Sequence, residues 1–150
     1  MDLADVDIEV GSIEFAASMD HWEGFTDFSK ASIDSFISDK SRAYKLFLAL
    51  EELISNIIRS AEELPTRQAK LKIAILKRTR EGENWLVVRT TDTGIRFDPH
   101  YHQRNSVDTN QPVHERAIGG LGIFLIEQSV DHAHSEWLNG SNINEISIRL

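Results

Sequence analysis

A glycine-rich segment is the first of three groups of residues in this chain whose types and spacing could do chemistry. Gly119, Gly120 and Gly122 are followed at once by an apolar run that is compatible with a helix. Glycine has no Cβ, so its backbone can approach a ligand closely, and the start of a helix aims unpaired N–H groups and a positive dipole end at one point. The segment therefore suits a phosphate, although a tight turn that packs a helix on a sheet would use the same residues.

The second group is a polar stripe on the strongest helix signal in the chain, over residues 42–63. Glu52 and Asn56 are four residues apart, so they lie one turn from each other on the same side, and Ser60 continues the stripe. A carboxylate and a carboxamide beside an otherwise apolar helix face are costly unless they have partners. The stripe either faces water or points into a site.

The third group is Asp92 and Gly94, at the end of a predicted buried strand. An Asp-x-Gly at this place puts a carboxylate beside a backbone that a ligand can approach closely. The same pattern is also typical of an Asx turn, which needs no ligand.

The elements that must position these groups follow from hydrophobic periodicity and turn residues. The pattern predicts a strand over 8–17, a helix that Ser18 caps and that runs to residue 37, the long helix over 42–63, and strands over 71–75 and 85–88. A loop over 100–117 then precedes the glycine segment, a helix to about residue 130 and a closing hairpin over 135–150. A loop of this length is typically a lid or disordered. The order predicts one α+β domain over 1–150, a two-layer sandwich of a mixed, mainly antiparallel sheet with helices on one face.

The amino-acid composition argues against several classes of function. The 150 residues include no cysteine, which excludes disulfides and thiolate chemistry, and the net charge of −8 argues against a nucleic-acid partner. A bound triphosphate would then need a metal ion or a few placed cations. The acidic start and the short apolar runs predict neither a signal peptide nor a membrane span, so we expect a cytoplasmic protein without a membrane partner. The pairs His100/His102 and His132/His134 lack the further ligands of a metal site.

The three groups, in this order, resemble the boxes of the GHKL (Bergerat-fold) ATPase superfamily, which includes gyrase B, the MutL ATPases and histidine kinases. Residues 52–56 resemble its N box, residues 92–99 its first glycine box and residues 119–122 its second. The Phe-Asp-Pro at 97–99, the short lid that ends at residues 115–118 and the apolar string after the glycines are similar to the anti-sigma regulatory factor, or switch-protein serine/threonine kinase, branch. The resemblance covers residues 13–150.

The resemblance implies a role for each residue of the first two boxes. Asn56 would coordinate Mg²⁺ through its side-chain oxygen, and Glu52 would act as general base or orient the attacking hydroxyl or water. Asp92 would accept a hydrogen bond from the adenine amino group, Gly94 would let the base lie against the backbone, and Phe97 would belong to the same nucleotide site.

The second glycine box and the lid complete the implied site. Gly120, Leu121 and Gly122 would present N–H groups to the phosphates, and Gly119 would belong to the same nucleotide site. Arg116 would contact the γ-phosphate, although a solvated loop arginine is the alternative. Two positions depart from the family pattern: Ser60 stands where many members have histidine, and Arg96, which we expect in solvent, stands where they have glycine or proline.

The function that the resemblance implies is that of an anti-sigma-type protein serine/threonine kinase. Such a protein would bind Mg·ATP, phosphorylate a small anti-sigma factor antagonist of the STAS type, and hold a sigma factor or similar regulator, often as a homodimer. Two alternatives remain open. One is a nucleotide-responsive binding module that acts by sequestering a partner. The other is a histidine-kinase ATP domain separated from its dimerisation helices.

Overall fold

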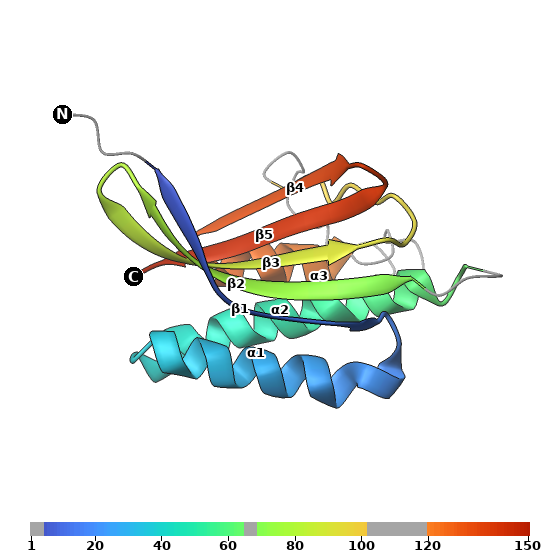
Figure 1. Cartoon of the computed structure of the whole chain (residues 1–150), viewed down its shortest axis with the longest axis horizontal. Helices are drawn as coiled ribbons and strands as arrows, with labels where there is room; N and C mark the ends of the chain where they lie inside the picture. The colour runs from blue at the N-terminus through green and yellow to red at the C-terminus, as the bar shows by residue number, and fades with distance from the viewer. Residues whose placement is uncertain (1–4, 65–68, 102–119) are drawn as a thin grey trace, which may run out of the picture.

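The computed structural model describes residues 5–64, 69–101 and 120–150 of the chain (Figure 1). The predicted site residues Arg116 and Gly119, and most of the predicted lid, lie outside these ranges. The elements are β1 (Val6–Ala16), the 3-10 turn η1 (Met19–His21), α1 (Trp22–Phe36), α2 (Lys40–Ala61), β2 (Lys70–Arg80), β3 (Glu83–Asp92), α3 (Gly120–Ser129), β4 (His132–Leu138) and β5 (Ser141–Arg149).

The strands form one five-stranded sheet in the order β1-β2-β3-β5-β4, and the helices pack on one face of it (Figure 1). The predicted α+β class and two-layer arrangement are confirmed. The four strand pairings of the described residues are all antiparallel, so the parallel component of the expected mixed sheet is not found there. The reason is that β5 returns from the tight hairpin with β4 and then lies antiparallel to β3.

Side-chain caps precede η1 and α2, and the sequence predicts the first of them, at Ser18. The Ser18 hydroxyl accepts a hydrogen bond from the Asp20 backbone N–H at 3.2 Å, and the Asp39 carboxylate accepts from the N–H groups of Ser41 and Arg42. From there α2 runs for 22 residues with a broad buried face. Its length matters for the site, because α2 presents its polar stripe far from its capped start.

The face of the sheet that meets the helices changes character along the strands. Its middle is apolar, since Val88 of β3 lies opposite Ile75 of β2 and Ile146 of β5, and all three are fully buried. Further along β3, the facing pairs become Thr90 with Asn144 and Asp92 with Asn142. The core therefore ends in a polar floor at one end of the sheet.

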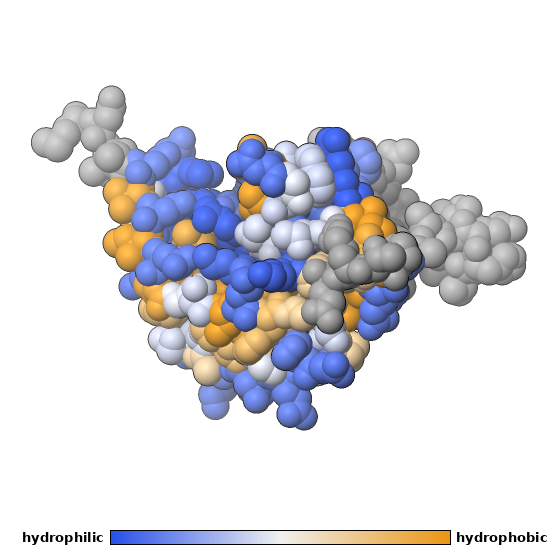
Figure 2. Space-filling view, turned by 45° about the vertical axis from the view of Figure 1, so that its right-hand side comes forward, coloured by the Kyte–Doolittle hydropathy of each residue, from blue (hydrophilic) through white to orange (hydrophobic). Residues whose placement is uncertain are grey.

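The first half of β1 does not follow its hydrophobic pattern. The alternation at Ile8 and Val10 is typical of a half-buried strand, yet their side chains are 57% and 40% exposed. The register shifts between Glu9 and Gly11, and beyond this β-bulge the strand leaves the helical layer with the β2–β3 hairpin (Figure 1). Figure 2 shows the resulting apolar surface beside the grey N-terminal end.

An ionic network joins four strands on the other face of the sheet. Arg78 of β2 pairs with Asp7 of β1 at 2.7 Å and with Glu145 of β5 at 2.9 Å, and Arg89 of β3 also pairs with Glu145 at 2.7 Å. Burial on its own would raise the pKa of Glu145, but the hydrogen bonds from Arg78 and Arg89 outweigh it and hold that pKa below its ordinary value. The hydrogen bond from Arg78 likewise lowers the pKa of Asp7.

Because of this network, we expect the free energy of unfolding to decrease at acidic pH. A carboxylate whose pKa is lower in the folded than in the unfolded state stabilises the fold at neutral pH, and this stability is lost as the pH falls through the lowered pKa, below about pH 4. Glu145→Gln should therefore flatten the acid limb of the unfolding free energy measured by denaturant titration at a series of pH values. Glu136→Gln, which removes an exposed carboxylate on β4, is the control. An equal flattening in both variants would contradict the prediction.

Candidate functional site

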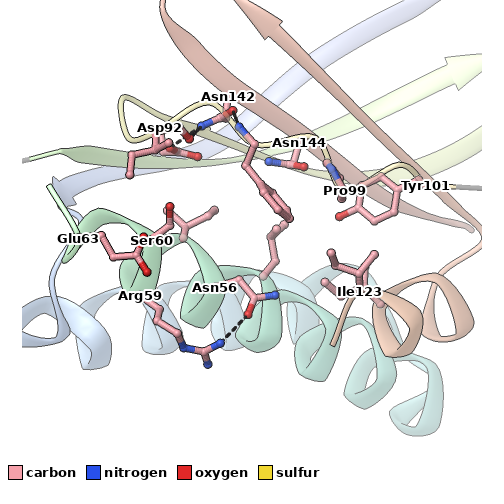
Figure 3. A pocket seen from close by; sticks show the side chains of 15 residues that line it. Asn56, Arg59, Ser60, Glu63, Asp92, Pro99, Tyr101, Ile123, Asn142 and Asn144 are labelled. Atoms are coloured by element: carbon pink, nitrogen blue, oxygen red, sulfur yellow. Dashed lines mark hydrogen bonds between the residues drawn. The ribbon is translucent and has the colours of Figure 1, made fainter. Parts of the chain in front are cut away.

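A pocket of about 230 Å³ lies between α2, α3, the polar floor of the sheet and the loop that follows β3 (Figure 3). Side chains from all four regions line it. They are Leu53, Asn56, Ile57, Arg59, Ser60, Glu63, Asp92, Ile95, Phe97, Pro99, Tyr101, Ile123, Ile126, Asn142 and Asn144.

The polar stripe of α2 forms one wall of this pocket. Asn56 and Ser60 are half-buried and line the cavity, so this part of the stripe points into a site rather than into bulk water. The Asn56 side-chain oxygen accepts a long hydrogen bond, 3.4 Å, from the Arg59 guanidinium (Figure 3). Mg²⁺ takes oxygen ligands and shares them with substrate phosphates, so this oxygen fits the predicted role as its ligand.

Glu52 lies one turn before Asn56 and is outside the lining of the pocket. Its carboxylate lies against the start of α3, where a Cβ atom added to Gly122 would be 2.1 Å from Oε1 of Glu52. Gly120 and Gly122 are in the first turn of α3, and the glycines with positive φ among the described residues are Gly82 and Gly140. A side chain at position 122 would therefore displace the Glu52 carboxylate, whereas the backbone conformation of Gly122 is an ordinary one. Leu121 lies between the two glycines in the same first turn.

Asp92 lies at the sheet side of the pocket and is 4% exposed. Its Oδ1 atom accepts hydrogen bonds from the Gly94 N–H at 3.0 Å and from Nδ2 of Asn142 at 3.1 Å. The predicted Asx turn is thus present, and it uses one oxygen only. Among the described residues none hydrogen-bonds to Oδ2, which leaves that oxygen as an acceptor for a ligand.

Burial raises the pKa of the Asp92 carboxyl, and the hydrogen bonds from Asn142 and Gly94 offset part of this effect. Burial therefore disfavours the ionised carboxylate of Asp92, and a ligand that donates a hydrogen bond to Oδ2 would stabilise it. Gly94 is buried directly beside this carboxylate, and a Cβ atom there would be 3.0 Å from Oδ1 of Asp92. Gly94 therefore lies close against the Asp92 carboxylate, and the approach of a base to this backbone stays a prediction.

Asn142 of β5 is a site residue that the sequence analysis did not identify. Besides Asp92, its Nδ2 donates to the Ile95 carbonyl at 2.8 Å, and its Oδ1 accepts from the Phe97 N–H at 2.9 Å. One side-chain amide thus fixes both the carboxylate and the loop that covers it (Figure 3). Phe97 lines the pocket with a side chain that is 50% exposed, as expected of a residue at the entrance.

Arg96, His132 and His134 are not among the residues that line the pocket. Arg96 is exposed, as the sequence analysis expects, and its guanidinium lies over the ring of Trp137 at 5.8 Å. His132 and His134 are at exposed positions on β4, and the part of the chain that the structure describes holds no cluster of three metal-ligating side chains.

Over the described residues, the antiparallel sheet and the helices α1, α2 and α3 form a two-layer α+β fold, with the polar-floored pocket between the sheet and α2 and α3. The chain belongs to the histidine kinase-like ATPase domain family, whose model matches residues 15–150. This confirms the GHKL-type superfamily and indicates ATP binding with ATPase- or kinase-type chemistry. A search of curated proteins finds no match. No helix within the described ranges has the length and hydropathy to cross a membrane.

The raised pKa of Asp92 predicts that adenosine binding weakens as the pH falls. In the role that the resemblance implies, the ionised carboxylate accepts a hydrogen bond from the adenine amino group, and a proton on Oδ2 would block it. Because the pKa is raised, this protonation is expected above the ordinary aspartate value of about 3.9. Titration of adenosine, which has no phosphate to titrate, should show a constant affinity at neutral pH and a decline that starts above pH 4. A decline that follows the ordinary aspartate value would contradict the prediction.

Proposed function

We propose that this protein is an anti-sigma-type protein serine/threonine kinase that binds Mg·ATP and transfers the γ-phosphoryl group to an antagonist protein. The observation that carries this proposal is that one pocket brings together Asn56 of α2 and Asp92 of β3, which are 36 positions apart in the sequence. Asn56, the proposed oxygen ligand for the metal, and Asp92, the proposed acceptor for the adenine amino group, lie on opposite walls of this cavity (Figure 3).

The placement of Glu52 supports the kinase chemistry. One turn from Asn56, its carboxylate lies at the start of α3, where the first-turn N–H groups suit phosphates. In the proposed step Glu52 takes the proton of a serine or threonine hydroxyl while the hydroxyl oxygen attacks the γ-phosphorus. The bond from that phosphorus to the bridging oxygen breaks, and ADP leaves. Mg²⁺, when bound by Asn56 and the phosphates, neutralises the charge of the triphosphate.

The residues outside the described ranges are assigned by the resemblance. In the proposal, Arg116 contacts the γ-phosphate, and the N–H group of Gly119 joins those of Gly120, Leu121 and Gly122 around the phosphates. Because the net charge of the chain is −8, a bound triphosphate needs a nearby cation, and Arg116 is the proposed one. The proposed partners are a STAS-type antagonist as substrate and a sigma factor or similar regulator that the protein sequesters, with the kinase working as a homodimer in the cytoplasm.

Phosphotransfer can be tested with labelled ATP and an antagonist protein encoded beside this chain. We expect label on a serine or threonine of the antagonist, and we expect Glu52→Gln to lower the rate by about 100-fold or more, the usual effect of a general base. Glu51→Gln, at the neighbouring half-buried position, is the matched control. ATP binding without label transfer would overturn the kinase proposal.

Two observations favour a second candidate, a nucleotide-responsive module that regulates a partner by sequestration. Glu52 is outside the lining of the pocket, and Ser60 replaces the histidine of many family members. In this case Glu52→Ala would capture the partner normally and regulation would persist. Loss of regulation in a Glu52→Ala variant that still captures the partner would instead support the kinase.

A further inference from the structure

The polar floor at the end of the sheet consists of two pairs of facing residues, and three of these four residues line the pocket. Thr90, Asp92, Asn142 and Asn144 are all buried, with exposed fractions of 0%, 4%, 4% and 6%. Asp92 and Asn142 hydrogen-bond to each other, whereas the pair next to them, Thr90 and Asn144, does not. Leaving buried polar groups without partners costs free energy, so this second pair needs an explanation.

The two members of the second pair relate differently to the cavity. Asn144 lines it, and none of the described residues hydrogen-bonds to its side-chain amide. The Thr90 hydroxyl likewise has no hydrogen-bond partner within the described ranges, but it is enclosed, and Thr90 does not contribute to the lining. The carboxamide of Asn144 is therefore a donor and acceptor at the cavity surface, where a ligand in the pocket can reach it.

The position of Asn144 on β5 determines which groups of a ligand its side chain can contact. Asn144 is two residues from Asn142 on the same face of the strand, about 7 Å further along the floor. It faces α2 and α3 across the pocket, on the same side as Asp92 (Figure 3). A ligand whose amino group donates to Oδ2 of Asp92 thus extends toward Asn144. The amino group of adenine has a second N–H, and that N–H and the ring nitrogen N7 form one edge, which a carboxamide matches with its acceptor and its donor.

We propose that Asn144 is a second base-recognition residue, whose Oδ1 accepts from the adenine amino group and whose Nδ2 donates to N7. This inference rests on the proposed binding of an adenine nucleotide in this pocket. It makes the site selective for the N6/N7 edge of the purine as well as for the amino group that Asp92 binds.

The test uses calorimetric titration of ATP and of 7-deaza-ATP, in which a C–H group replaces N7. Wild type should bind ATP about tenfold more tightly, as expected for one lost hydrogen bond in a buried site. Asn144→Leu should bind ATP more weakly and lose the preference between the two nucleotides. Thr90→Val is the matched control, because it removes the neighbouring buried hydroxyl without changing the lining, and it should keep the preference.

Three other outcomes would overturn either the assignment of Asn144 or the proposed function. Equal binding of the two nucleotides by wild type would overturn the assignment whether or not the variants fold, as would a full preference in Asn144→Leu. Failure of wild type to bind ATP at all would overturn the proposed function itself, so the two failures are distinguishable.

Discussion

Asp92→Asn is expected to weaken ATP binding by about 100-fold or more, the largest effect of any single substitution on affinity. In the variant the remaining oxygen can still accept from Gly94 and Asn142, as Oδ1 of Asp92 does. The new NH₂ group then faces the pocket and opposes the adenine amino group. A lost charge-assisted hydrogen bond together with an unpaired donor corresponds to about 3 kcal/mol, which is about 100-fold in affinity.

The same substitution should not weaken the fold. Because burial raises the pKa of Asp92 above its unfolded value, the ionised carboxylate opposes folding at neutral pH, and the ligand-free protein gains stability from this group as the pH falls toward that pKa. Asp92→Asn removes the opposing charge, so its unfolding free energy should equal or exceed that of wild type. Calorimetric titration and denaturant unfolding measure the two quantities. Asp98→Asn, at an exposed position of the same loop, is the control and should bind normally. Tight ATP binding by Asp92→Asn would exclude the assigned role.

Gly122→Ala is expected to lower phosphotransfer about as much as Glu52→Gln does, by about 100-fold. The added methyl group would occupy the space of the Glu52 carboxylate, whose Oε1 lies 2.1 Å from the ideal Cβ position. The carboxylate is the end of a flexible side chain, so it can move aside, and alanine is favoured over glycine in a helix by about 1 kcal/mol. The expected result is a stable protein with a displaced general base.

A double-mutant cycle tests this mechanism. If Gly122→Ala acts through Glu52, the Glu52→Ala/Gly122→Ala double variant should be no slower than Glu52→Ala. Gly24→Ala is the control for adding a methyl group to a helix, since its Cβ would instead meet the ring of Phe15 at 2.9 Å. It should affect stability and not phosphotransfer. Additive rate losses in the double variant would show that Gly122 acts independently of Glu52.

The parts of the site that the sequence predicts are those that local patterns determine. The four-residue spacing in α2 places Asn56, and the end of a buried strand places Asp92, because both depend only on the period of one element. Asn142 and Asn144 depend on which strand lies beside β3 and in which register, and a shift of one residue would turn both away from the pocket. The sequence does not predict the exposure of Ile8 for a related reason. The alternation itself shows neither the β-bulge nor where the helical layer ends.

The contact between Arg96 and Trp137 should make the fluorescence of Trp137 report the position of the loop that carries Arg96. Arg96 belongs to the loop that Asn142 holds, while Trp137 is on β4, at the edge of the sheet. A guanidinium over an indole ring changes the electrostatic environment of the chromophore. Any displacement of the loop during nucleotide binding would therefore change the emission of Trp137, so that stopped-flow fluorescence can follow the loop in unlabelled protein. A variant with Trp22 and Trp85 replaced by phenylalanine would assign the signal to Trp137.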